Sequence, residues 1–258
     1  MITLLSPAKS LDYETPLPVK RVTKPRLLDD SERLADLAKN LSPQQLSSLM
    51  SISDKLGVLN YDRFQQWQAA PESSSQRAAV FAFKGDVYQG LDAYSLNADD
   101  AAFAQTHLRI LSGLYGLLRP LDAILPYRLE MGTRFENPRG KDLYAFWQQT
   151  LTEQTNKDLK QSEGDARIVN LASNEYFKAL LKSELDGDLL TPIFKDEKNG
   201  TYKLVSFYAK RARGAMARFI IDNRVTTADD LKEFAWEGYR FQKSASSDSE
   251  FIFHRKQK

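Results

Sequence analysis

The sequence contains few residues of the types that carry out catalysis, and their spacing excludes most familiar active sites. The 258 residues include no cysteine and two histidines, His107 and His254, which lie far apart in the chain. Thiol chemistry, disulfides and cysteine-ligated metal centres are therefore excluded, as is a metal site rich in histidine. The phosphate-binding patterns G-x-x-x-x-G-K-[ST] and G-x-G-x-x-G are absent, and so are G-x-S-x-G and H-E-x-x-H.

One catalytic pattern is present. Ser6-Pro7-Ala8-Lys9 matches S-x-x-K, in which a lysine one helical turn after a serine acts as its base. The companion K-T-G is missing. The alternative is that Ser6 caps a turn after the first strand while Lys9 is solvated or binds an anion. Several carboxylates stand near predicted turns, and a pair of them can act as acid and base only if the fold brings two into one cleft.

The most distinctive segment of the chain is basic, although the net charge is only +2. On a helix over residues 207–224, apolar side chains gather on one face. The opposite face collects the basic ones, namely Lys210, Arg211, Arg213, Arg218 and Arg224. Such a face is either merely solvated or binds an anion. Gly214 within this helix indicates the close approach of a neighbouring helix or of a phosphate.

Two further segments have features of anion sites. Residues 41–67 predict two short helices, 42–50 and 60–67, joined by a loop that can present backbone N–H groups and Lys55 to a DNA phosphate. The alternative is a packing unit without a ligand. Residues 109–134 combine Gly113 and Gly116 with Arg109, Arg119, Arg128 and Arg134. These arginines either bind an anion or pair with Asp122, Glu130 and Glu136.

The elements that must position these residues form an α+β protein, with a mixed sheet flanked by helices. The predicted strands are 2–5, 79–83, 109–111, 168–171, the pair 190–195 and 201–207 around an Asn199-Gly200 turn, and the pair 239–242 and 251–254. The predicted helices are 31–40, 42–50, 60–67, 140–161, 174–181, 207–224 and 228–234. Ser42, Asn60, Ser173 and Thr227 are the expected N-caps. Residues 1–258 are expected to form one domain.

Seven motifs resemble those of the YaaA family, bacterial proteins of the peroxide stress response. They are LSPAKSLDY at 5–13, ISDKL at 52–56, AFKGDVY at 82–88, the segment 108–132, GKDLY at 140–144, NLASNEYF at 170–177 and FYAKRARG at 207–214. The resemblance implies a family-specific fold with a helix-hairpin-helix-like element and a positively charged cleft. It also implies DNA binding and a role in peroxide resistance linked to low free iron.

These observations lead to one principal hypothesis. The protein binds DNA largely independently of sequence, because a basic cleft contacts the phosphate backbone. The residues expected to contact phosphate are Lys9, Lys55, Lys84, Arg119, Arg128, Lys210, Arg211 and Arg213. The alternative is an enzyme acting on a phosphorylated or nucleotide-like small molecule, with a pocket formed by Ser6, Lys9, Lys84, Asp86, Tyr115, Arg119, Arg128 and Glu130.

Other partners and ligands receive less support. The ligand spacing does not favour direct iron binding, so no metal and no cofactor are expected. The sequence has neither a run of about 18 apolar residues nor the N-terminal pattern of a signal peptide. We therefore expect a cytoplasmic protein without a membrane or an obligate protein partner.

Overall fold

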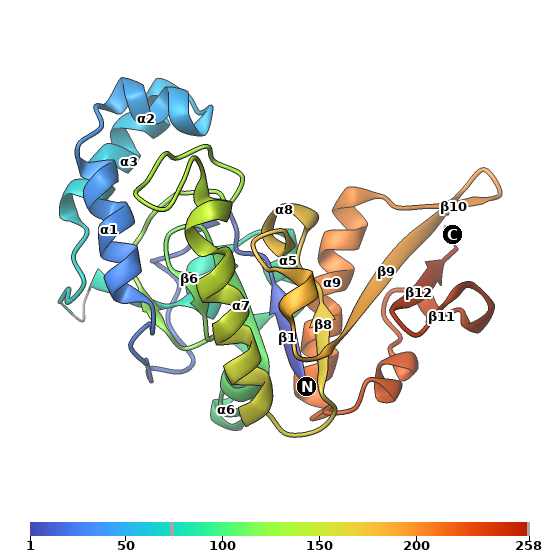
Figure 1. The fold of residues 1–258 in the computed structure, drawn as a ribbon. Helices are drawn as coiled ribbons and strands as arrows, with labels where there is room; N and C mark the ends of the chain where they lie inside the picture. Colours follow the sequence, from blue (N-terminus) through green and yellow to red (C-terminus); the bar gives the residue numbers. More distant parts are fainter. Residues whose placement is uncertain (73–74, 257–258) are drawn as a thin grey trace.

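An eight-stranded mixed sheet forms the centre of the computed structural model, which describes residues 1–72 and 75–256 (Figure 1). The strand order is β11-β12-β9-β8-β1-β5-β6, and β10 pairs with β9. Neighbours from β12 to β5 run parallel, whereas β6, β10 and β11 are antiparallel to their partners. The bounds are β1 Ile2–Leu5, β5 Leu108–Ser112, β6 Gly116–Leu118, β8 Arg167–Asn170, β9 Asp188–Lys198, β10 Thr201–Lys203, β11 Arg240–Phe241 and β12 Glu250–Arg255.

The sequence of the central strands explains their position. Every residue of β1 and β5 is buried. Short apolar runs of this kind are typical of parallel strands that are covered on both faces. The antiparallel strands β9 and β10 are joined through Asn199 and Gly200, which both have positive φ angles. This is the hairpin turn that the Asn-Gly pair predicts. The mixed sheet confirms the predicted α+β class.

Helices cover the sheet and extend beyond it. Figure 1 shows α1, α2 and α3 together at one end of the molecule, with α9 and the strands β9 to β12 at the other. The helices are α1 Leu28–Lys39, α2 Pro43–Met50, α3 Asp54–Gln66, α4 Ala79–Ala82, α5 Asp86–Leu91, α6 Ala98–His107, α7 Leu143–Gln161, α8 Asn174–Phe177 and α9 Ser206–Asp222. Two small sheets complete the fold, β2 Ser10–Leu11 with β4 Phe83–Lys84, and β3 Arg77–Ala78 with β7 Ala123–Ile124. Short 3₁₀ helices are η2 Ala93–Ser95, η3 Lys182–Glu184, η4 Asp229–Glu233 and η5 Lys243–Ala245.

Several predicted elements are wrong in type or extent. Residues 79–83 were expected to form a strand, but α4 occupies 79–82 between two-residue strands. A short apolar run that is buried all round fits a buried helix as well as a strand. The helix expected at 60–67 begins at Asp54, and Asn60 lies buried in its middle, with its Nδ2 donating to the Leu56 carbonyl at 2.8 Å. The element after Thr227 is the 3₁₀ helix η4, α8 ends at Phe177, and β10 ends at Lys203.

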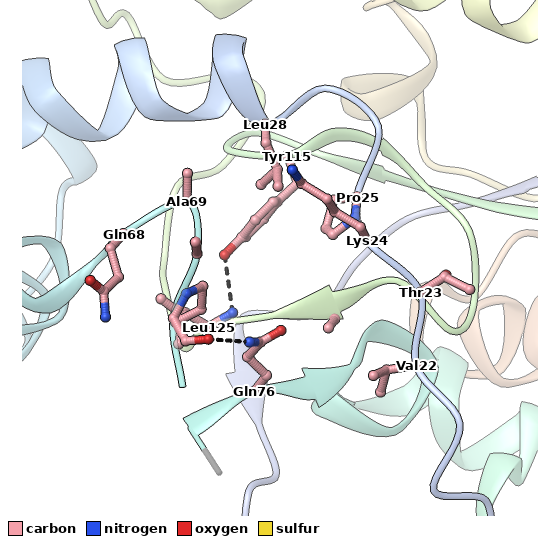
Figure 2. A pocket seen from close by; sticks show the side chains of 13 residues that line it. Val22, Thr23, Lys24, Pro25, Leu28, Gln68, Ala69, Gln76, Tyr115 and Leu125 are labelled. Carbon is pink, nitrogen blue, oxygen red and sulfur yellow. Dashed lines mark hydrogen bonds between the residues drawn. The ribbon is translucent and has the colours of Figure 1, made fainter. Parts of the chain in front are cut away.

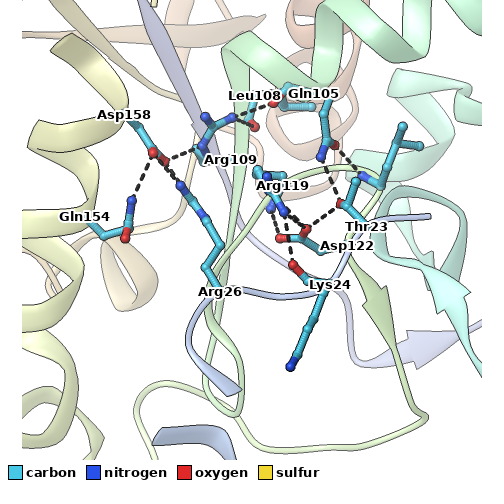
Figure 3. A network of polar contacts seen from close by, with 11 residues as sticks. Thr23, Lys24, Arg26, Gln105, Leu108, Arg109, Arg119, Asp122, Gln154 and Asp158 are labelled. Carbon is cyan, nitrogen blue, oxygen red and sulfur yellow. Dashed lines mark hydrogen bonds and ion pairs between the residues drawn. The ribbon is translucent and has the colours of Figure 1, made fainter. Parts of the chain in front are cut away.

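Two buried carboxylates anchor the segment that precedes α1 (Figure 3). Asp158 of α7 accepts from Arg26 at 2.8 Å and from Arg109 of β5 at 2.5 Å. Asp122 is fully buried and pairs with Arg119 at 2.8 Å, and the Thr23 hydroxyl donates to the same carboxylate at 2.6 Å. The sequence left two roles open for Arg119, anion binding or pairing with a carboxylate. In the structure Arg119 pairs with Asp122. The two networks fix the path of the chain from Thr23 to Arg26.

The close packing of α5 against α9 explains the glycine in the basic helix. A Cβ atom on Gly214 would lie 1.8 Å from the Val87 carbonyl oxygen, and one on Gly90 would lie 2.0 Å from that of Arg211. Only glycine allows two helix backbones to approach this closely. The neighbour of Gly214 is thus a helix.

None of the helices that the structure describes combines the length and the apolar composition that a membrane span requires.

Candidate functional site

Strand β1 lies at a topological switch point. The parallel strands β5 and β8 flank it on opposite sides, so the chain leaves β1 toward one side of the sheet and later returns to the other. Ligands of open parallel sheets bind outside the carboxyl ends of strands at such a point. Ser6 follows β1 at this edge, and Ser173 lies shortly after β8. This edge is the candidate site.

Ser6 is held in place by hydrogen bonds from two other segments. Its Oγ accepts the backbone N–H of Ser173 at 2.9 Å and lies 3.3 Å from the Ser173 Oγ. Its carbonyl accepts the Tyr88 hydroxyl of α5 at 3.0 Å. Residues 6–8 form no helical turn, and the Lys9 ammonium contacts Glu130 instead of Ser6. The serine–lysine geometry of the S-x-x-K pattern is therefore not formed.

Glu130 brings together two of the predicted cations. Its Oε2 lies 2.6 Å from the Lys9 Nζ, and its Oε1 lies 2.9 Å from an Arg128 nitrogen. Partial burial opposes ionisation of Glu130, but hydrogen bonds from both cations outweigh it and hold the pKa of this carboxyl below its usual value. Lys9 remains 64% exposed. Two cations share one carboxylate, so this cluster keeps a positive charge.

A second cluster surrounds Asp12, next to the first. Its carboxylate accepts the Thr15 N–H at 3.0 Å and lies 3.3 Å from Arg77 and 3.7 Å from Lys84. The Thr15 N–H is the main reason why the pKa of Asp12 falls to about 2, against the opposing effect of burial. Pairing of Ser10 with Lys84 across β2 and β4 places Lys84, which is 66% exposed, beside the Lys9 segment. Lys9, Lys84 and Arg128 thus approach the same edge.

The other residues of the predicted pocket have separate positions. Asp86 begins α5 and is half-buried. Tyr115 is buried, and its hydroxyl oxygen accepts the Trp67 indole N–H and the Leu125 N–H. Arg119 is committed to Asp122. The structure therefore brings Lys9, Arg128 and Glu130 together with Lys84 nearby, while Tyr115 and Arg119 make other contacts.

A tight helical hairpin is formed by α2 and α3. The capping box of Ser42 and Gln45 starts α2, as the Ser-Pro pair predicts, and Ser51 ends it in the left-handed conformation. A Cβ on Gly57 would lie 2.0 Å from the Ser47 Oγ, so glycine allows the two helices to touch. Lys55 is exposed in the first turn of α3. The hairpin is observed, and its action as a DNA-binding module stays a prediction.

The buried residues of α9 are small or apolar and its basic residues are exposed or half-buried, as expected, but three of these basic residues already contact carboxylates. Helix α9 is buried on several sides, because it packs against α5 as well as against the sheet. Arg211 is half-buried between Phe207 and Trp236 and lies 3.5 Å from Glu237. Two further arginines also have partners: Arg218 binds Asp222 and the Asp92 carbonyl, and Arg224 lies beyond the helix end and binds Asp100.

Two basic residues of this segment remain without a carboxylate. Lys210 is exposed, and Arg213 is half-buried, and neither makes an ion pair within residues 1–72 and 75–256. Burial lowers the pKa of Arg213, although a guanidinium stays protonated. Of the two, Lys210 is the more accessible to a macromolecular anion.

Sequence reasoning missed several residues of the strand-edge site. Ser173 was expected only as a helix cap, yet its side chain makes no capping bond and lies against Ser6. Glu175 accepts the Gly132 N–H at 3.0 Å, and the Arg77 guanidinium donates to the Asp12 carboxylate at 3.3 Å. Ser173 and Glu175 stand in the motif at 170–177, which was the available signal for them, whereas Arg77 lies outside the seven motifs. Spacing alone does not reveal contacts across the sheet. Among the residues that the structure describes, no cluster of three or more potential metal ligands occurs.

Fold and site together define an α+β protein with a cationic polar site at the switch point of its mixed sheet. A family model described as "Peroxide stress protein YaaA" matches residues 1–245. A UPF0246 protein of Saccharophagus degradans is 56% identical over 257 residues, covering 100% of both chains. UPF0246 proteins of Teredinibacter turnerae and Idiomarina loihiensis are 54% and 55% identical, and the alignments cover 98% or more of each chain. The chain belongs to the YaaA family of peroxide stress proteins.

Proposed function

We propose that this member of a peroxide stress family binds DNA through the phosphate backbone, with little dependence on base sequence. By this proposal it limits iron-dependent oxidative damage by occupying or helping to repair DNA. The observation that carries the proposal is the α2–α3 hairpin, which presents the start of α3 and the exposed Lys55 to solvent.

The start of α3 has the features of a phosphate site. The first N–H groups of a helix have no partner within the helix. Ser53 stands at the N-cap position, but its side chain makes no capping bond. The N–H groups of Asp54, Lys55 and Leu56 are therefore available to a phosphate oxygen, and the helix dipole favours an anion there. The Asp54 carboxylate opposes this attraction.

The strand-edge clusters and α9 supply further positive charge. The first cluster has two cations, Lys9 and Arg128, for the one carboxylate of Glu130. The second has Lys84 and Arg77 for the one carboxylate of Asp12, so each cluster has one excess positive charge. Lys210 adds an exposed ammonium at the start of α9. Figure 1 shows α2, α3, α8 and the first turn of α9 along the upper side of the view. A duplex that contacts the hairpin would find its remaining phosphate contacts on these lysines.

The direct test is a salt titration of affinity for two unrelated duplexes. Replacing Lys55 by alanine should weaken both complexes equally and make the slope of log K against log salt shallower by about 0.9, the value for one lost phosphate contact. Asp54→Asn should strengthen both complexes. The matched control is Lys157→Ala on α7, because Lys157 is exposed and makes no ion pair in the described ranges. An unchanged slope in folded Lys55→Ala would contradict the proposal.

A second candidate function rests on the switch point itself. The bond between Ser6 and Ser173 joins the ends of two parallel strands, where a small phosphorylated or nucleotide-like substrate would meet Lys9, Lys84 and Arg128. Ser6→Ala discriminates between the two functions. It should leave duplex binding unchanged if DNA is the ligand. If the site is enzymatic, wild-type protein should bind AMP or ribose 5-phosphate, and the variant should lose that binding.

A further inference from the structure

A separate pocket of about 320 Å³ lies between the segment that precedes α1, the segment that follows α3, and β7 (Figure 2). Its walls are mainly apolar and include Pro25, Leu28, Ala69 and Leu125. The pocket is at the end of α3 opposite to the hairpin, about 18 Å away along this helix of 13 residues. None of the residues proposed to contact DNA lines it.

The buried wall of the pocket contains a hydroxyl whose proton is unused. The Tyr115 oxygen accepts the Trp67 indole N–H at 2.9 Å and the Leu125 backbone N–H at 3.0 Å. Both partners are donors only, so the phenolic proton has no acceptor in the described part of the chain. Burial raises the pKa of Tyr115 to about 12, which keeps the proton in place at neutral pH. A ligand oxygen in the pocket would satisfy it.

The rim of the pocket contains an ammonium without a carboxylate. Lys24 lines the pocket, and Figure 2 shows its side chain extending toward the Tyr115 ring. Residues 1–72 and 75–256 provide no ion-pair partner for it. Its carbonyl accepts from Arg119 at 3.0 Å, and the preceding Thr23 is bound to Asp122 (Figure 3). The buried network therefore fixes the backbone beneath this lysine, so the pocket is formed before any ligand arrives.

We propose that this pocket binds a small organic acid with an apolar body. The carboxylate pairs with Lys24, the apolar body contacts Leu28 and Leu125, and the Tyr115 hydroxyl donates to a ligand oxygen. The volume lies at the lower end of the range for small-molecule sites, which favours a compact aromatic or branched aliphatic acid. This inference is independent of the proposed DNA binding, because the two sites share no residue.

The test compares 3-phenylpropanoate with its uncharged amide, by calorimetric titration of the full chain. The carboxylate should bind at least tenfold more tightly than the amide, since only the carboxylate pairs with Lys24. Lys24→Met should reduce that ratio below threefold. Lys20→Met is the control, because Lys20 is exposed but does not line the pocket. A ratio that Lys24→Met leaves unchanged would overturn the proposal.

A second variant tests the location of the bound acid. Ala70 is exposed and lines the pocket, so Ala70→Trp should block it without disturbing the core. Loss of 3-phenylpropanoate binding in this variant, with an unchanged circular dichroism spectrum, supports the assignment. Absence of binding to wild-type protein at millimolar concentration refutes it, as does full binding to Ala70→Trp.

Discussion

The replacement of Asp12 by asparagine should destabilise the protein in a manner that depends on pH. Asp12 is 9% exposed, and its carboxylate accepts the N–H groups of Glu14 and Thr15 and contacts Arg77. Its pKa is about 2 in the folded protein, compared with 3.8 for the unperturbed group. The ionised form is therefore favoured by folding, and asparagine cannot reproduce that form.

The size of the effect follows from the shift. A difference of about 1.8 pKa units corresponds to about 2.4 kcal/mol of unfolding free energy at pH 7. Because the folded pKa is lowered, this contribution is present above the unfolded pKa and is lost as pH falls through the folded pKa. It should decline to about 1.3 kcal/mol at pH 3 and about 0.4 kcal/mol at pH 2.

The assay is urea unfolding followed by tryptophan fluorescence at pH 7, 4, 3 and 2, for wild type and Asp12→Asn. Asp62→Asn is the control, since Asp62 is exposed on α3 and makes no hydrogen bond or ion pair in the described ranges. If wild type unfolds in acid without urea, a carboxyl ¹³C titration of Asp12 replaces the lowest points. A stability difference that stays constant from pH 7 to pH 3 would refute the reasoning.

Three other predictions concern stability. Asp158→Asn should cost about 3–5 kcal/mol in urea unfolding, since the buried Arg109 and the half-buried Arg26 lose their common carboxylate, and a loss below 1 kcal/mol would contradict this. Gly214→Ala should lower the melting temperature clearly because its Cβ would meet the Val87 carbonyl, while Gly85→Ala, which has room for a Cβ, should not. Burial lowers the pKa of His107, so its neutral form is favoured by folding. Stability should therefore fall as pH drops below about 6.5, and less so in a His107→Gln variant; equal pH profiles would argue against this.

Local sequence signals predicted those elements whose causes are local. The Ser42-Pro43 start of α2 and the Asn199-Gly200 turn depend on a few adjacent residues, and both are confirmed. Asn60 was misread as a helix cap because its polarity suggested a boundary. In the folded protein it is buried, and its own side chain bonds to the preceding turn. Periodicity cannot tell whether a polar residue lies at an element's end or is satisfied inside it.

The candidate site shows the same limit at longer range. Lys9, Lys84 and Arg128 were expected in one pocket, and they approach one another because β2 pairs with β4 and because Lys9 and Arg128 share Glu130. Their carboxylate partners could not be assigned, because Glu130 and Asp12 meet these cations only in the folded chain. The carboxylate partners of the arginines at 211, 218 and 224 were missed for the same reason, because Glu237, Asp92 and Asp100 lie outside helix α9 in the sequence.

The difference between arginine and lysine explains why counting basic residues overestimates the anion-binding surface. Arg119, Arg128 and Arg211 all contact carboxylates at least partly inside the fold. A planar guanidinium with several donors suits such sites, whereas an ammonium is strongly hydrated and stays at the surface. Lys55 and Lys210 are accordingly exposed, without ion pairs in the described ranges. Charge that can meet an external anion therefore resides mainly on lysines, while the arginines largely hold together the fold that presents them.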